Sequence, residues 1–307
     1  MKALVLLSGG LDSGLAAKIV RDQGITLKGV ALRSYFFDVS LAAQKQANEL
    51  GIPLTVVDIS QEQLSLVKNP HYGYGTGINP CIDCHALMLK MTEELARKEG
   101  ACFLITGDVL GQRPMSQNKR AIMMIDKEVG IEGLVLRPLS AGLLPATIPE
   151  KNSWIDRKKL FSIHGRSRKK QLELSKKFGL QEYTTPAGGC LLTDPNFSQR
   201  LKNLLARTKN PSASDLALLK YGRHFWQKNI LIVVGRDEKE DKKIQGLSKK
   251  GDMVMELKDI PGPITLVRSW REKIGKINVE KAKKLTEHYS VKARKKRKKT
   301  TVVLLHY

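Results

Sequence analysis

The sequence predicts an α/β protein with a doubly wound, mostly parallel sheet, followed by a smaller, basic α+β domain. Two observations favour this fold class. In the first half of the chain, short apolar runs alternate with amphipathic helical patterns, which is typical of parallel sheets covered by helices. In the second half the charge changes: residues 1–150 hold 15 basic and 15 acidic residues, so residues 151–307 carry the whole net charge of +23.

This uneven charge indicates a polyanionic partner for the second half of the chain. Nucleic acid is the expected partner. A membrane surface is less favoured because no strongly amphipathic helix accompanies the charge, and a plain solvated surface is the remaining alternative. There is no run of 18 apolar residues and no secretory pattern at the N-terminus, so we expect a cytoplasmic protein without a membrane span.

The first expected strand, residues 3–7, ends at a glycine loop, and a helical pattern begins directly after it. Glycine lets backbone N–H groups approach phosphate, and the start of a helix adds a partial positive charge, so this order is typical of an anion-binding site. Asp12 is unusual in such a loop and fits a helix N-cap or a ligand of Mg²⁺ or of a nucleotide hydroxyl. The expected nucleotide-binding residues are Ser8, Gly9, Gly10, Asp12 and Ser13.

The next elements continue the alternation of strands and helices. Residues 26–32 and 54–59 are expected strands, and a helix is expected over 38–50 between them. The first of these strands ends at Leu32 and Arg33. Because nucleotides rest at the carboxyl ends of parallel strands, we expect both residues to contact the nucleotide.

A glycine-rich turn, GDVLGQRPMSQ, follows the apolar strand expected at 101–106. Such a turn at the carboxyl end of a strand is a further expected part of the site. Residues 134–139 form another short strand, and 155–165 and 167–178 are expected to be polar, basic helices. The functional residues expected in the turn are the nucleotide contacts Gly107 and Gln112, the catalytic Asp108 and the basic Arg113.

The four cysteines are more typical of ligands, nucleophiles or buried thiols than of disulfides. Cys81 and Cys84 stand at the start of a helical pattern, where the helix N-terminus favours thiolates. Cys190 follows two glycines in a loop that can present a thiol, and it is the expected third partner. Cys102 lies in an apolar strand and is expected to be buried in the core.

Several of these features occur together in a fixed order: SGGLDS at residues 8–13, Cys-x-x-Cys at 81–84, GDVLGQ…SQ at 107–117, VLRPL at 135–139 and a downstream Gly-Gly-Cys. This order resembles the catalytic domain of the tRNA thiouridine synthases, particularly the 4-thiouridine synthase group, over residues 1 to about 200. The hexapeptide resembles the pyrophosphatase (PP) loop of ATP-pyrophosphatases. The resemblance implies an adenine nucleotide alpha hydrolase-like sheet, with ATP and Mg²⁺ as cofactors and tRNA as partner.

The second half shows another resemblance. Strands are expected at 230–234, 253–257 and 264–268, and the pieces GRD, KKGD and KDIPGP beside them are similar to the RNA-binding domain of NFACT-type proteins. The 4-thiouridine synthase group usually carries an RNA-binding domain before the loop, so here we expect RNA binding to come from this later domain. The expected division is an ATP-pyrophosphatase domain at 1–180, a Cys190-bearing extension or linker at 181–210, the NFACT-type domain at 211–290 and a basic tail at 291–307.

The resemblance implies a tRNA sulfurtransferase that adenylates a uridine carbonyl with ATP and replaces its oxygen by sulfur. Sulfide or a persulfide is the expected sulfur donor, and a homodimer is one open oligomeric state. The residues expected to act in catalysis are Asp12, Cys81, Cys84, Asp108 and Cys190.

The sulfur step leaves two versions open. In one, Cys81, Cys84 and Cys190 hold a four-iron four-sulfur (4Fe-4S) cluster with one iron free for sulfide. In the other, one cysteine carries a persulfide and another resolves it as a disulfide. A zinc site would lack its fourth thiolate unless His85 replaced it. Two other classes also remain, an ATP-dependent amide-forming ligase of the same superfamily and a non-catalytic RNA-binding protein.

Overall fold

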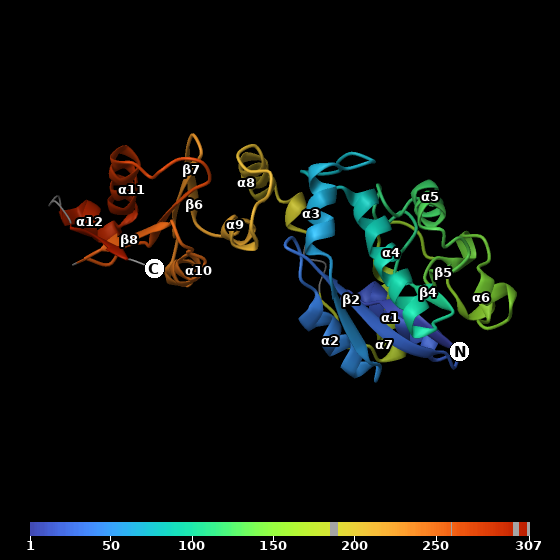
Figure 1. Cartoon of the computed structure of the whole chain (residues 1–307). Helices are drawn as coiled ribbons and strands as arrows, with labels where there is room; N and C mark the ends of the chain where they lie inside the picture. Colours follow the sequence, from blue (N-terminus) through green and yellow to red (C-terminus); the bar gives the residue numbers. More distant parts are fainter. Residues whose placement is uncertain (185–189, 259, 297–300, 306–307) are drawn as a thin grey trace. The chain divides into compact units, whose positions relative to one another are not determined.

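The computed structural model in Figure 1 describes residues 1–184, 190–258, 260–296 and 301–305. They form two compact units, Met1–Thr193 and Asp194–Tyr307. Residues 181–210, expected as an extension or linker, are therefore divided between the two units. Gly188 and Gly189 of the Gly-Gly-Cys motif lie outside the described residues.

The first unit is built on a parallel sheet, as the sequence predicts. Its strand order is β3-β2-β1-β4-β5, and all pairs are parallel. β2 and β3 lie on one side of β1, and β4 and β5 lie on the other, so the strand order reverses at β1. Such a reversal opens a crevice at the carboxyl ends of the strands. The strands are β1 (Lys2–Leu6), β2 (Thr26–Arg33), β3 (Leu54–Asp58), β4 (Phe103–Ile105) and β5 (Val135–Leu136).

Helices cover both faces of this sheet, so the strands at its centre are rich in buried apolar residues. Leu4 belongs to one core cluster and Val5 to the other, although both lie in β1. The first cluster includes residues of α4 and α5, and the second includes residues of α1, α2 and α7. The helices of the unit are α1 (Leu11–Arg21), α2 (Ser40–Glu49), α3 (Ser60–Lys68), α4 (Cys81–Glu99), α5 (Lys119–Val129), α6 (Ile148–Lys151) and α7 (Lys169–Phe178), with 3₁₀ turns η1 (Ala141–Leu143), η2 (Arg157–Lys159) and η3 (Leu191–Thr193).

Two predictions for this unit are wrong. Cys102 is exposed rather than buried, because β4 begins only at Phe103 and Cys102 lies before it. The helix expected over 155–165 is absent; the only regular element there is the 3₁₀ turn η2. Ile155 and Ile163 are both buried, and the backbone N–H of Ile163 donates to the carbonyl oxygen of Leu139, so tertiary contacts near both ends of this segment hold it in place.

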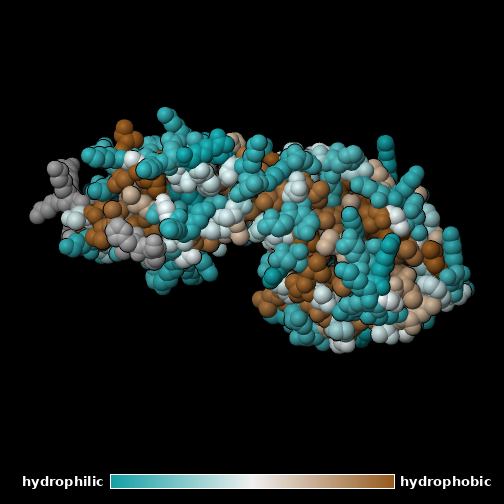
Figure 2. Space-filling model, viewed as in Figure 1, coloured by the Kyte–Doolittle hydropathy of each residue, from teal (hydrophilic) through white to brown (hydrophobic). Residues whose placement is uncertain are grey.

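The second unit is α+β, as predicted, and its sheet is antiparallel with the order β10-β8-β9-β7-β6. The segment expected as a basic tail contributes α12 and the edge strand β10, whose apolar residues pair with β8. In Figure 2, hydrophilic side chains cover much of the visible face of this unit. Its elements are α8 (Pro195–Leu205), α9 (Ala213–Leu218), β6 (Arg223–Gln227), β7 (Ile230–Val234), α10 (Glu238–Gly246), β8 (Met253–Leu257), β9 (Thr265–Ser269), α11 (Lys276–Tyr289), α12 (Val291–Lys296) and β10 (Val302–Leu305).

None of the described helices of either unit combines the length and the apolar character that crossing a membrane requires.

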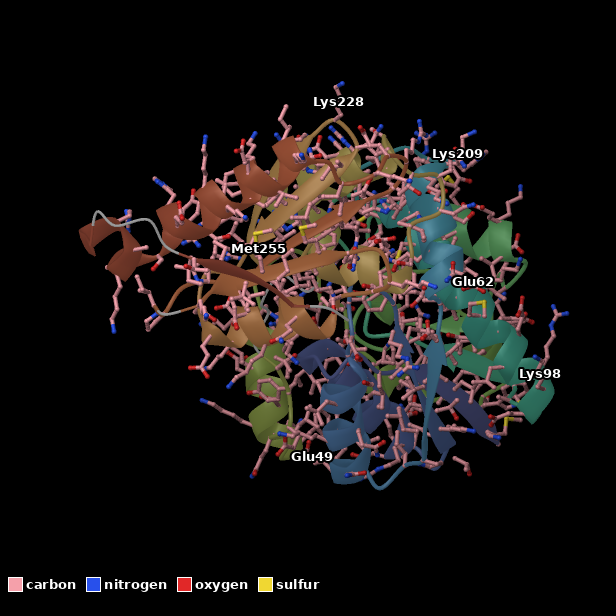
Figure 3. The ribbon with its side chains drawn as sticks, turned by 60° about the vertical axis from the view of Figure 1, so that its left-hand side comes forward. Glu49, Glu62, Lys98, Lys209, Lys228 and Met255 are labelled. Atoms are coloured by element: carbon pink, nitrogen blue, oxygen red, sulfur yellow. The ribbon has the colours of Figure 1, made fainter. Side chains whose placement is uncertain are left out.

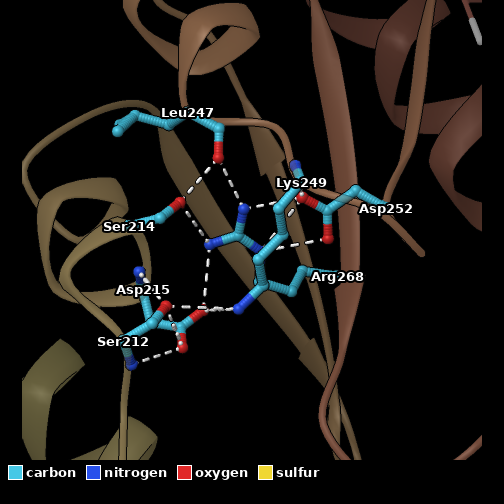
Figure 4. Close-up of polar contacts among 7 residues, drawn as sticks. All are labelled: Ser212, Ser214, Asp215, Leu247, Lys249, Asp252 and Arg268. Atoms are coloured by element: carbon cyan, nitrogen blue, oxygen red, sulfur yellow. Dashed lines mark hydrogen bonds and ion pairs between the residues drawn. The ribbon is translucent and has the colours of Figure 1, made fainter. Parts of the chain in front are cut away.

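A buried ion-pair network links β9 to the segments beside it (Figure 4). Arg268 is completely buried, and its guanidinium donates to Asp252 at 2.6 Å and to Asp215 at 2.9 Å. It also donates to the carbonyl oxygen of Leu247 at 2.7 Å. Lys249 reaches Asp215 from the surface, at 2.8 Å. One guanidinium therefore compensates two buried carboxylates.

We expect Arg268→Met to lower the free energy of unfolding of this unit by about 3–5 kcal/mol, because it leaves the buried Asp252 carboxylate without its guanidinium partner and Asp215 with Lys249 alone. The matched control is Lys249→Met, which removes a side chain that is 39% exposed and pairs with the same Asp215. It should cost only about 0–1 kcal/mol. Denaturant unfolding followed by tryptophan fluorescence measures both, and equal losses for the two variants would contradict this role of Arg268.

Candidate active site

The glycine loop lies between the end of β1 and the start of α1, and its own side chains hold its shape. The Ser13 hydroxyl donates to the carbonyl oxygen of Gly10 at 2.9 Å, and the backbone N–H of Ser8 donates to Ser13 Oγ at 3.3 Å. Gly9 has a φ of +69°, and a Cβ at this position would overlap Ala42 of α2. Only glycine fits there, since both the backbone angle and the close packing exclude a side chain.

The two carboxylate oxygens of Asp12 have different surroundings. Its Oδ2 accepts hydrogen bonds from Gln112 Nε2 at 3.1 Å and from Arg168 Nη2 at 3.3 Å. Its Oδ1 is buried and has no hydrogen-bond partner among the described residues. A Cβ on Gly107 would come within 2.6 Å of the Asp12 carbonyl carbon, so the turn after β4 lies directly against the loop. The structure thus brings Asp12, Gly107 and Gln112 together.

Arg168 is a residue of this site that the sequence analysis missed. It stands at the N-cap of α7, and its Nε is buried without a partner in the described part of the chain. The available signal was a basic run at the start of an expected helix, and such a run usually marks a solvated face.

The end of β2 carries the two predicted nucleotide contacts in different surroundings. The side chain of Leu32 is buried in the core cluster that contains Leu4. Arg33 pairs with Asp58 of β3, with 3.0 Å between Arg33 Nε and Asp58 Oδ2, and its side chain is 52% exposed. Contact of both residues with the nucleotide stays a prediction.

The three predicted cysteines lie in one neighbourhood. Cys81 is the first residue of α4, Cys84 follows one turn later, and Cys190 precedes η3. The segment before α4 and η3 are joined by a hydrogen bond from the backbone N–H of Ile78 to the carbonyl oxygen of Leu192, at 3.2 Å. Two amide side chains donate to the sulfurs: Gln63 to Cys84 at 3.1 Å and Asn79 to Cys81 at 3.2 Å.

The charges of these groups act on one another. Burial raises the pKa of all three thiols, and it raises that of Cys84 to about 12. Negative charge adds to this effect: a thiolate at Cys190 also raises the pKa of Cys84, and one at Cys81 raises that of Cys190. The positive charge of Arg113 opposes the rise of the pKa at all three thiols without cancelling it. Burial therefore acts against the effect expected from the helix N-terminus, because desolvation disfavours the thiolate.

The surroundings of the three thiols include donors that suit negatively charged sulfur. The amide groups of Gln63 and Asn79 and the positive charge of Arg113 would offset such charge. In the described ranges, no three His, Cys, Asp or Glu side chains are grouped closely enough to hold a metal ion.

Asp108 lies in a buried network rather than at an open position. Its Oδ1 accepts from Gln117 at 2.9 Å, and its Oδ2 accepts from Thr106 at 2.7 Å and from Arg137 at 3.3 Å. His85 Nε2 is 3.3 Å from the same Oδ2. Burial alone would raise the pKa of Asp108, but the charges of His85 and Arg137 and the hydrogen bonds hold it well below the usual range.

Asp108 is consequently an ionised, fully engaged carboxylate. Through His85 it fixes the start of α4, which carries Cys81 and Cys84. This geometry suits a positioning residue better than a proton acceptor, and it pairs His85 with a carboxylate instead of with the sulfurs.

Comparison with known proteins adds the family to this geometry. Residues 1–143 match the family model described as thiamine biosynthesis protein (ThiI), and residues 222–306 match the model of the NFACT protein RNA binding domain. The chain carries a ThiI-family domain followed by an NFACT-type RNA-binding domain. Both predicted resemblances are thereby confirmed.

Individual relatives are similar over parts of the chain. A tRNA-specific 2-thiouridylase of Acidithiobacillus ferrooxidans is 39% identical over 118 residues, which cover 34% of this chain and 33% of the relative. A probable tRNA sulfurtransferase of Anoxybacillus flavithermus is 26% identical over 198 residues, covering 53% and 49%. The chain spans a third to a half of the length of these curated relatives.

Among solved structures, a 4-thiouridine synthetase–RNA complex with bound ATP is 21% identical, with a TM-score of 0.37, and covers 58% of this chain and 51% of that one. A predicted tRNA methyltransferase subunit of Methanocaldococcus jannaschii is also 21% identical, with a TM-score of 0.34, covering 45% and 69%.

Proposed function

We propose that this chain is an ATP-dependent tRNA sulfurtransferase. One observation carries the proposal: a single turn after β4 connects the nucleotide loop with the cysteines. Gln112 in this turn donates to Asp12, and the charge of the next residue, Arg113, acts on all three thiols. ATP cleavage and sulfur delivery would then take place in adjacent parts of one crevice.

The loop would hold the phosphates of ATP. Backbone N–H groups of Gly9 and Gly10 and the hydroxyl of Ser8 would bind them, and the unpaired Asp12 Oδ1 would bind Mg²⁺. The uridine carbonyl oxygen attacks the α-phosphorus, pyrophosphate leaves, and the base becomes adenylated. A sulfur nucleophile then attacks the activated carbon, and AMP leaves with the former carbonyl oxygen.

The cysteines would supply the sulfur. When bound, a four-iron four-sulfur cluster held by Cys81, Cys84 and Cys190 provides one iron without a protein ligand, where sulfide can be carried. Gln63 and Asn79 would donate to the ligand sulfurs, and Asp108 would keep the start of α4 in place through His85.

A persulfide route without a cluster is the second candidate, because the same three thiols lie near one another. A persulfide sulfur on one cysteine attacks the adenylated base and displaces AMP. A second cysteine thiolate then attacks the sulfur of the first cysteine. This attack forms a disulfide between the two cysteines and releases the thiolated base. An external thiol reductant restores the two thiols.

The second unit would bind the tRNA. The basic excess of the chain lies after residue 150, and this part includes the NFACT-type domain. Neutralised phosphates release counterions, so we expect the affinity for tRNA to fall steeply as salt increases.

Purification without oxygen tests the two sulfur routes. We expect a brown protein with about four irons per chain, which forms a thiolated nucleoside in tRNA only when ATP and sulfide are both present. A colourless, iron-free protein that thiolates tRNA from a persulfide donor contradicts the cluster and supports the second route. A protein that releases pyrophosphate with an amine acceptor, and never thiolates tRNA, contradicts the proposed function itself.

A further inference from the structure

Three flat side chains are stacked in the second unit. The ring of Trp226 on β6 lies 5.5 Å from that of Trp270, centroid to centroid, with 30° between the ring planes. The guanidinium carbon of Arg207 lies 4.3 Å from the centroid of the Trp226 ring. Arg207 follows α8 and Trp270 follows β9, so three separate segments converge on this group, called the Arg–Trp–Trp stack below.

Hydrogen bonding does not account for two tryptophans here. Both are half-buried and lie with part of their surface against the core cluster that contains Leu231. The Nε1 atoms of both indoles are buried and have no hydrogen-bond partner among the described residues. A buried indole N–H normally finds an acceptor. What these positions use is therefore the flat aromatic ring.

Arg207 also holds the turn beside the stack. Its Nε donates to the carbonyl oxygen of Lys228 at 2.6 Å, and Lys228 has a φ of +49° in the turn between β6 and β7. The backbone N–H of Trp270 donates to Asn229 in the same turn. The stack and the turn therefore form one connected structure at this end of the sheet.

The segments that carry the stack are basic and exposed. Figure 3 shows Lys209 and Lys228 both reaching away from the ribbon on the same side. The acidic Glu272 is partly engaged, since its carboxylate accepts from the backbone N–H of Asn229. The exposed basic residues within three positions of a stack member are Lys209, Lys228, Arg271 and Lys273.

We propose that the Arg–Trp–Trp stack is a platform on which an unpaired RNA base stacks, while the surrounding lysines and arginine contact the phosphates. Aromatic rings and guanidinium planes hold unstacked bases in this way. A base within an RNA duplex already stacks on its neighbours, so the platform selects a single-stranded segment. This inference rests on the proposed function, because it takes RNA as the ligand.

Binding of the full chain to a fluorescent single-stranded RNA of mixed sequence tests the platform. Stacking one base contributes about 1–3 kcal/mol, so we expect Trp226→Leu and Trp270→Leu each to weaken binding about 5- to 150-fold. Arg207→Lys, which keeps the charge but loses the plane, should weaken it by a smaller factor. Trp226→Phe and Trp270→Phe keep a stacking ring and should retain most of the affinity, so the test stands even if a leucine variant does not fold.

The matched control is Arg223→Lys. Arg223 lies 4.5 Å from the ring centroid of Tyr289, so this change removes a similar cation–π contact outside the platform. It should leave single-strand affinity within about twofold, since exposed cation–π contacts contribute little. If it weakens binding as much as Arg207→Lys does, the platform is contradicted.

Fluorescence gives an independent measurement, because the chain has three tryptophans and the third, Trp154, lies in the first unit. In a Trp154→Phe background, single-stranded RNA should quench the remaining emission, and a duplex or an acidic protein should not. Unchanged emission with bound single-stranded RNA, or equal quenching by duplex, overturns the inference. If the chain stacks RNA but never thiolates tRNA, only the proposed activity is refuted. If the chain thiolates tRNA and its affinity for RNA does not change when Trp226 or Trp270 is replaced, only the platform is refuted.

Discussion

Asp12→Asn is expected to lower ATP-dependent pyrophosphate release at least about 100-fold, because it removes the carboxylate that would hold Mg²⁺ against the phosphates of ATP. The carboxylate orients Gln112 and Arg168 through one oxygen and leaves the other buried and unpaired. An asparagine keeps the shape but cannot attract Mg²⁺ or balance the guanidinium. The measurement is pyrophosphate formed at saturating ATP and tRNA.

The matched control is Asp22→Asn at the other end of the same helix. Asp22 pairs with Lys18 at 2.6 Å, and its side chain is 38% exposed. This variant should keep pyrophosphate release within about twofold, since exposed ion pairs contribute little. Asp12 is not the N-cap of α1, which is Gly10, so comparable activity in the two variants would contradict any direct role of Asp12 in the reaction.

The parts of the fold that depend on local sequence could be predicted. A strand buried on both faces must be apolar throughout, and β1 shows this as an uninterrupted run. Boundaries were harder, because burial changes within one residue: Cys102 is exposed while Phe103 is 2% exposed. The segment 155–165 looked helical from its polarity, yet its only regular element is the turn η2, and Ile155 and Ile163 are buried near its two ends.

In the candidate site, too, the features that depend on local sequence could be predicted and those that depend on distant contacts could not. The glycine loop is recognisable because its requirements are local: a positive φ at Gly9 and a helix that begins at once. Arg168 was not predictable, because its contact with Asp12 spans 156 residues and its neighbours resemble a solvated basic face. The raised pKa values of the thiols depend on burial by the whole fold, which helix position alone does not reveal.

Replacing any one of Cys81, Cys84 and Cys190 with serine is expected to reduce thiolation of tRNA to below about 1% of the wild-type rate, because a hydroxyl neither carries sulfur nor ligates iron as a thiolate does. Pyrophosphate release should fall by less than about threefold, because adenylation depends on the loop and Asp12, and the two half-reactions use different groups. The measurements are thionucleoside content of the tRNA by mass spectrometry and pyrophosphate from the same reaction.

Cys102→Ser is the control, since Cys102 is exposed and lies at the start of β4, outside the group formed by the other three cysteines. It should thiolate tRNA at the wild-type rate. If all four serine variants thiolate tRNA at the wild-type rate, the thiols are dispensable and both sulfur routes through these cysteines are contradicted. If only Cys190→Ser loses iron while Cys81→Ser and Cys84→Ser keep it, the shared ligand set is wrong, and the charge coupling among the thiols reflects proximity alone.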